Sequence, residues 1–184
     1  VEAEEQLLLP MVERLLSKDA ALRVLWAPRS PQRFQAVVEA LSSKGISVTQ
    51  RSSLGPDMDG PMPDVQVIVG DSIGEMDAYY PVADLVFVGA SLVDHGGHNI
   101  IEPLGLGRPV VMGPSTFGID FAAELAAQTG AFESLPDVAD LENRVSQLLA
   151  DASALKRMSA AAVAFSADKN GAAGRTFAGL LPLL

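Results

Sequence analysis

Short apolar runs rich in β-branched residues alternate along the chain with longer segments in which apolar residues recur every three or four positions. The short runs predict buried strands, and the longer segments predict amphipathic helices. The expected strands are residues 22–27, 46–50, 65–69, 84–89 and 109–112. The expected helices are residues 1–17, 31–44, 74–82, about 98–107, 118–129 and 137–150, followed by an Ala-rich helical tail over 153–184 that breaks near Asn170 and Gly171.

Strands that alternate with helices predict an α/β fold with a parallel sheet. We expect a single Rossmann-like, doubly wound domain over residues 1–184, with helices on both faces of the sheet. The helix over 1–17 has no strand before it, although a doubly wound domain normally begins with one. We therefore expect the first strand to lie upstream of this sequence. Residues 51–64 hold three Pro and two Gly without periodicity, which predicts a long loop that is mobile or near a site.

The charge and composition exclude several classes of function. The 184 residues include 13 Lys and Arg against 23 Asp and Glu, which gives a formal net charge of −10. An acidic chain with few aromatic residues and no basic cluster lacks the features of a nucleic-acid surface. The absence of Cys excludes disulfides, zinc–thiolate sites and thiol nucleophiles. No apolar run reaches the roughly 18 residues of a membrane span, and the N-terminal stretch lacks the basic region of a signal peptide, so we expect a chain that is soluble by itself.

The densest group of candidate residues lies between an expected strand and an expected helix, over Gly89–Pro103. Gly96 and Gly97 allow the backbone to turn tightly and to approach a ligand, and the start of the helix offers unpaired N–H groups to an anion. Asn99 and Glu102 have the spacing of a capping box, in which the carboxylate returns to the N–H of the cap residue. Alternatively, Glu102 accepts hydrogen bonds from the two hydroxyls of a ribose.

Two histidines, His95 and His98, flank these glycines. A histidine in such a loop either forms a local hydrogen bond or acts as a general base, and the sequence favours the first role.

A second candidate segment is Ala27–Pro31, at the end of the first expected strand. Its Arg29, with Arg33 close by, can pair with a phosphate or a carboxylate at the edge of the sheet where ligands bind. The alternative is a surface arginine in a turn fixed by proline, and the sequence favours neither.

A third segment, residues 70–76, also lies between a strand and a helix. We expect Asp71 or Ser72 to cap the helix, with Glu75 as the returning carboxylate. Gly74 marks a position where the backbone can approach a ligand.

The fourth segment, residues 112–117, is a turn of small residues whose free backbone groups can face a planar base. The carboxyl ends of parallel strands meet at one edge of the sheet, so all four segments are expected to converge there. Their convergence indicates a ligand of nucleotide size.

The segments PRSPQRF, GDSIGEM, GGHNIIEP and MGPSTFGID together resemble the 3-deoxy-D-manno-octulosonic acid (Kdo) transferases of lipopolysaccharide synthesis. The order and spacing of all four fit, and the resemblance covers essentially the whole chain as the C-terminal half of these two-domain GT-B glycosyltransferases. It implies that this half binds the CMP part of the donor, CMP-Kdo.

The resemblance also implies where the rest of the reaction takes place. The N-terminal half would supply the acceptor groove for a lipid A precursor, the membrane anchor and a glutamate general base, so no catalytic residue is expected in this chain and the chain alone is expected to be inactive. The transfer would be inverting, would need no metal or other cofactor and no nucleic-acid partner, and would occur at the cytoplasmic face of the bacterial inner membrane.

Carried over to this sequence, the resemblance implies eight donor-binding residues: Arg29, Gly96, Gly97, Asn99, Glu102, Met112, Gly113 and Pro114. We expect Gly74 and His98 to belong to the same donor site. The arginine would face the anionic groups of the donor, the loop of residues 96–99 its phosphate, the glutamate its ribose, and residues 112–114 the cytosine. Three positions depart from the family pattern: Ser30 stands in place of the usual His, Gln32 in place of Glu, and Pro103 in place of Ala.

Two other classes of protein stay open at this point. One is a sugar-nucleotide epimerase of the same two-domain architecture, which would bind UDP. The other is a non-enzymatic, flavodoxin-like binding module. The one Asp-x-Asp match, Asp57 and Asp59, lies in the loop rich in Pro and Gly, and we expect no metal there.

Overall fold

The computed structural model describes residues 1–55 and 63–169. The strands are β1 (Val24–Trp26), β2 (Val48–Gln50), β3 (Val67–Val69), β4 (Val86–Val88), β5 (Val110–Met112) and β6 (Phe132–Ser134). The α-helices are α1 (Glu2–Lys18), α2 (Pro31–Ser43), α3 (Met76–Tyr79), α4 (Ile101–Gly105), α5 (Asp120–Thr129), α6 (Val138–Ala150) and α7 (Ala152–Lys169). Two short 3-10 helices are η1 (Arg51–Leu54) and η2 (Tyr80–Val82).

The strands form two parallel sheets of three strands each, in the orders β1-β3-β2 and β4-β5-β6. In the first sheet Val67 of β3 lies opposite both Val24 and Val48. The central strands β3 and β5 are buried along their whole length, as a strand covered on both faces must be. These parallel sheets and their helices confirm the expected α/β class.

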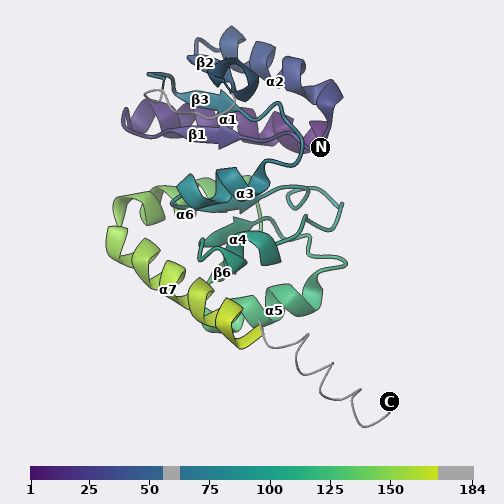
Figure 1. The fold of residues 1–184 in the computed structure, drawn as a ribbon, viewed down its shortest axis with the longest axis vertical. Coiled ribbons are helices and arrows are strands. Elements are labelled where there is room, and N and C mark those ends of the chain that lie inside the picture. Colours follow the sequence, from purple (N-terminus) through teal and green to yellow (C-terminus); the bar gives the residue numbers. More distant parts are fainter. Residues whose placement is uncertain (56–62, 170–184) are drawn as a thin grey trace.

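Helices cover both faces of the second sheet. Alternate side chains of a strand point to opposite faces. Accordingly, Val111 packs into a core with α1 and α6, whereas Val110 and Met112 belong to a second core with α4, α5 and α7. In Figure 1 the first sheet lies in the upper half of the molecule with α1 and α2, and α5, α6 and α7 surround the second sheet. The doubly wound arrangement is therefore confirmed.

Helix α1 packs against strands of both sheets. Its buried apolar face shares one hydrophobic core with β3 and β5. This face consists of Leu8, Met11, Val12, Leu15 and Leu16. Ion pairs extend the contact, because Glu142 of α6 accepts hydrogen bonds from Arg14 Nε at 2.8 Å and from Lys18 Nζ at 2.9 Å.

The structure differs from the expected elements in three places. Strand β6 was not expected, because its sequence, Phe-Glu-Ser, has no β-branched residue. Helix α4 spans five residues, Ile101–Gly105, instead of about ten. The helix expected over 74–82 is divided into α3 and η2, and Pro81 lies in η2. The expected break near Asn170 and Gly171 and the Asp57–Asp59 pair lie outside the described residues.

None of the described helices combines the length and the apolar character that a membrane span requires.

The contact of Glu142 with Arg14 and Lys18 predicts a pH-dependent stability. The hydrogen bond from Arg14, followed by that from Lys18, holds the pKa of Glu142 below its usual value against the effect of burial. A lowered folded-state pKa stabilises the fold above the unfolded pKa, near 4.3, and this stabilisation is lost as the pH falls through the folded pKa. We expect Glu142→Gln to lower the Tm by about 2–6 °C at pH 7 and by much less at pH 3.

Thermal unfolding followed by circular dichroism at both pH values measures this difference. Glu124→Gln, at an exposed position of α5, is the matched control and should leave the Tm unchanged at both. An equal loss for Glu142→Gln at pH 7 and pH 3 would contradict the expected role of the charge.

Candidate functional site

Hydrogen bonds join the loops at the carboxyl ends of β1, β4 and β5. Arg29, after β1, contacts His98 in the loop after β4 through Nη1 and Nδ1 at 2.9 Å. Ser91, also after β4, accepts a hydrogen bond from the backbone N–H of Gly113, after β5, at 2.8 Å. Three of the four segments that were expected to converge are therefore joined by hydrogen bonds.

The Arg29–His98 contact defines the protonation of the histidine. A guanidinium can only donate, so Nδ1 of His98 accepts and the ring proton lies on Nε2. Burial, and next the charge of Arg29, lower the pKa of His98 below its usual value. At neutral pH the site therefore contains one exposed guanidinium next to a neutral imidazole.

Arg33 does not join this site. Its guanidinium contacts Glu5 of α1 at 2.6 Å and Glu2 at 3.3 Å. Arg29, in contrast, forms no ion pair with a carboxylate among the residues that the structure describes. Ser30 and Gln32, two positions that depart from the family pattern, are hydrogen-bonded to each other.

Asn99 and Glu102 interact, but not as a capping box. The side-chain amide of Asn99 donates to Glu102 Oε1 at 3.0 Å, and Asn99 Oδ1 accepts the backbone N–H of Ile101 at 2.8 Å. In a capping box the carboxylate would instead accept the backbone N–H of the cap residue. Glu102 is exposed, and its orientation is fixed by Asn99 on one side only.

Gly96 and Gly97 allow their loop to pack against the turn after β5. Both have positive φ, and a Cβ on Gly96 would lie 2.3 Å from the carbonyl oxygen of Phe117. A Cβ on Gly97 would lie 2.3 Å from Met112 Cε. The glycines thus face neighbouring protein atoms, and close packing of the two loops explains them.

The backbone amides of this loop are only partly available to an anion. The N–H of Gly97 donates to Ala90 and that of His98 donates to Gly89. Within the described part of the chain, no hydrogen bond occupies the amides of Asn99 and Ile100. Asn99 is an exposed residue of the expected loop and keeps an amide that an anion can reach, whereas Ile100 is fully buried.

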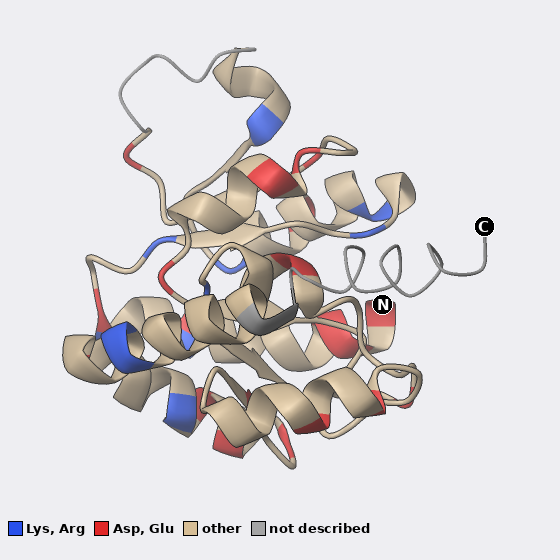
Figure 2. Cartoon of the chain, turned by 60° about the horizontal axis from the view of Figure 1, so that its bottom comes forward, with Lys and Arg blue, Asp and Glu red and all other residues tan. Residues whose placement is uncertain are grey.

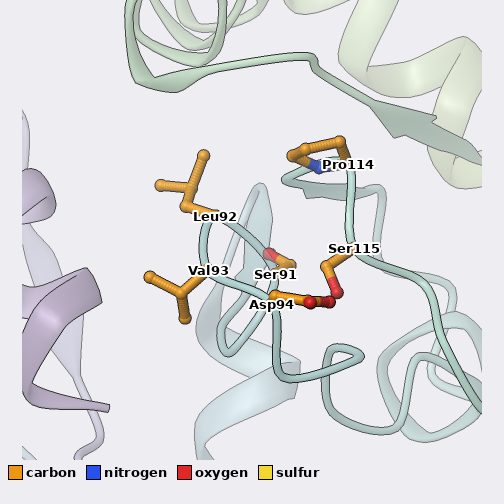
Figure 3. A pocket seen from close by; sticks show the side chains of 6 residues that line it. All are labelled: Ser91, Leu92, Val93, Asp94, Pro114 and Ser115. Carbon is orange, nitrogen blue, oxygen red and sulfur yellow. The ribbon is translucent and has the colours of Figure 1, made fainter.

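A pocket of about 270 Å³ lies between the loop after β4 and the turn after β5. Figure 3 shows the two segments facing each other across it. The lining residues are Ser91, Leu92, Val93, Asp94, Pro114 and Ser115. Of these six residues, the sequence predicted only Pro114 as a site residue. The other five lie within the candidate segments, but their residue types do not distinguish them from ordinary loop residues.

The three expected site residues 112–114 differ in their exposure. The side chain of Met112 is fully buried and packs beneath Gly97, so it supports the loop from inside the core and is not exposed to a ligand. Gly113 is also buried, and its N–H and C=O are bonded to the side chains of Ser91 and Ser134. Pro114 is exposed and borders the pocket.

The segment after β3 forms a polar network of its own. Asp71 accepts hydrogen bonds from Gln50 and from the backbone N–H of Ser52, and Ser72 bonds to Glu75 and Tyr79. The expectation that Asp71 or Ser72 caps the next helix was wrong, because α3 begins at Met76 without a side-chain cap. The hydrogen bonds from Ser72 and then Tyr79 lower the pKa of Glu75.

Gly74, in the same segment, has a φ of +85° and open space around its Cβ position. The left-handed backbone of this turn therefore explains why a glycine occupies position 74.

Lys and Arg are scattered over the molecule, and acidic residues outnumber them (Figure 2). Within residues 1–55 and 63–169, no three or more Asp, Glu or His side chains gather as a cluster that could hold a metal ion.

The sequence and the structure were compared with those of known proteins. No protein-family model matches the sequence. The chain is 36% identical over 178 residues to the 3-deoxy-D-manno-octulosonic acid transferase of Bordetella pertussis, an alignment that covers 95% of this chain and 41% of that protein. It is 34% identical over 182 residues to the enzyme of the same name from Haemophilus influenzae, covering 98% of this chain and 42% of that protein. The chain thus spans about two fifths of the length of these curated relatives.

A solved structure is similar over most of its own length. It is the crystal structure of the C-terminal CMP-Kdo binding domain of WaaA from Acinetobacter baumannii. The TM-score is 0.78 at 30% sequence identity, and the match covers 88% of this chain and 82% of that domain.

The contact between Ser91 and Gly113 predicts that a methyl group at position 113 is not tolerated. A Cβ there would lie 2.4 Å from the carbonyl carbon and oxygen of Ser91, which are backbone atoms and cannot move aside cheaply. We expect Gly113→Ala to destabilise the fold by about 1–3 kcal/mol in chemical denaturation.

Gly105→Ala is the control, because nothing lies within 4 Å of its Cβ position at the end of α4. This variant should be as stable as the parent protein or slightly more stable. A Gly113→Ala protein of parental stability would show that the two loops are not held as described.

Proposed function

Because the chain belongs to the 3-deoxy-D-manno-octulosonic acid transferase family, we propose that it is the donor-binding domain of such a transferase and binds CMP-Kdo. The observation that carries this proposal is the Arg29–His98 contact. It brings a guanidinium that has no carboxylate partner in residues 1–55 and 63–169 to the loop that also holds Asn99 and Glu102. The similarity to a solved CMP-Kdo binding domain supports the same ligand.

Each part of the nucleotide has a matching group in the proposed site. Arg29 would pair with the phosphate through charged hydrogen bonds. The amide of Asn99, an exposed residue, would donate a further hydrogen bond to one of its oxygens. Glu102, exposed and oriented by Asn99, would accept hydrogen bonds from the two hydroxyls of the ribose. The backbone around Gly113 and Pro114 would face the cytosine.

The proposed reaction is an inverting displacement. A hydroxyl oxygen of the acceptor would bond to the anomeric carbon of Kdo while the bond from that carbon to the phosphate oxygen breaks, and CMP would leave with the electron pair. Arg29 would stabilise the negative charge that develops on the leaving phosphate. The hydroxyl proton would pass to a general base outside this chain, in the N-terminal domain.

We propose that the remaining steps require that N-terminal domain as well. It would hold the lipid A precursor, the acceptor, and would bring the reaction to the cytoplasmic face of the inner membrane. This chain alone would then bind the donor nucleotide without transferring Kdo, because chemistry requires both domains to close around the donor.

The role of Arg29 predicts a salt-dependent affinity. We expect the chain to bind CMP more tightly than UMP or UDP in calorimetric titrations, and Arg29→Ala to weaken CMP binding by roughly 1.5–3 kcal/mol at low salt. The loss should shrink as the salt concentration rises, because screening weakens the lost charge interaction. Arg157→Ala, at an exposed position of α7, is the control and should bind CMP like the parent protein. Preference for UDP would instead support an epimerase of the same fold.

Glu102→Gln separates ribose binding from a structural role. The variant keeps the shape of the side chain but loses the charged acceptor, so CMP affinity should fall by roughly 1–3 kcal/mol. The Tm should stay within about 1 °C, because α4 is short and the side chain is exposed. A lower Tm with unchanged affinity of the folded protein would identify Glu102 as a local structural residue only.

A further inference from the structure

A carboxylate from helix α1 is buried against the loop that borders the pocket. Glu4 is 3% exposed, although it lies in the first turn of the helix. Its Oε2 accepts the backbone N–H of Ala90 at 2.6 Å, and its Oε1 accepts those of Ser91 at 2.8 Å and Leu92 at 2.9 Å. Three successive amides thus converge on one side chain that is more than 80 residues away in the sequence.

These three residues position both sides of the pocket. Ser91 and Leu92 line it directly. Ser91 also accepts the backbone N–H groups of Gly113 and Ser115, through its hydroxyl and carbonyl oxygens, at 2.8 and 3.0 Å. The carbonyl of Ala90 accepts the N–H of Gly97, so the loop that leads to His98 and Asn99 starts from the same point.

The backbone of Ala90 has an unfavourable conformation. Ala90 has a φ of +63°, and no other non-glycine residue in the described part of the chain has a positive φ. The left-handed region is unfavourable for alanine because its Cβ approaches the carbonyl oxygen. The hydrogen bonds to Glu4 supply the interaction that compensates for this strain.

We propose that Glu4 is a positioning residue for the donor site, which fixes the loop after β4 in the conformation that binds the nucleotide phosphate and ribose. The proposal rests on the proposed function of this site. Glu4 does not touch the pocket itself and acts through Ala90, Ser91 and Leu92. The carboxylate is suited to this because it accepts three N–H groups at once, whereas a glutamine offers one acceptor oxygen and turns an NH₂ group toward a backbone donor.

The test compares Glu4→Gln with Glu5→Gln. Glu5 is an equally buried carboxylate on the same helix turn, but it contacts Arg33 and not the loop. We expect Glu4→Gln to weaken CMP binding about tenfold at a temperature where the protein is fully folded. The amide protons of Ala90, Ser91 and Leu92 should shift upfield in its NMR spectrum. Glu5→Gln should lower the Tm but change neither the affinity nor these three resonances.

A second substitution distinguishes positioning from general destabilisation. Ala90→Gly removes the strain at the positive φ, so adding it to Glu4→Gln should recover roughly threefold in affinity. If Glu4→Gln does not fold, Glu4→Asp keeps the charge but withdraws the carboxylate by one methylene, and its affinity should fall as well. CMP affinity of a folded Glu4 variant within twofold of the parent value would overturn the proposal. Absence of CMP binding by the parent protein would instead refute the proposed function.

Discussion

The packing of helix α1 against strands of both sheets is the contact on which the rest of the described structure depends. The β1-β3-β2 and β4-β5-β6 sheets are not joined by a ladder of hydrogen bonds in the described residues. Their common core is built around the apolar face of α1, and hydrogen bonds to α6 and to the loop after β4 fix the helix at both ends. Burial of the apolar face stabilises the packing of α1, but hydrophobic contacts are not directional. The buried hydrogen bonds fix the orientation of the helix.

The site at the ends of the strands follows from this arrangement. Arg29 follows a strand of the first sheet and His98 follows a strand of the second, so their contact requires the two sheets to be held in a fixed relation. In a chain with a net charge of −10, a guanidinium without an acidic partner provides a local attraction for an anionic ligand that the overall charge does not. Arg33 does not provide such an attraction, because two carboxylates of α1 already neutralise its charge.

The sequence was sufficient for the elements that depend on local pattern. Valine-rich runs identified five strands, because a buried parallel strand requires apolar residues on both faces. Strand β6 was missed because its pairing with β5 determines it, while its own three residues include no β-branched residue. The same limit applies to the site. Spacing identified Asn99 and Glu102 as a pair, but the partners of Gly96, Gly97 and Asp71 come from other loops and depend on the tertiary fold.

The long sequence separation of the contacts made by α1 has a consequence for the order of folding. Glu4 contacts residue 90 and Arg14 contacts residue 142, so these hydrogen bonds close loops of 86 and 128 residues. Loop closure of this length costs chain entropy before any contact compensates for it, and proteins dominated by such contacts fold slowly. Helix α1 precedes these partners in the sequence, so its contacts with residues 90 and 142 form only after both later segments have been synthesised. We therefore expect the loop after β4, and the pocket that it borders, to become ordered late in folding.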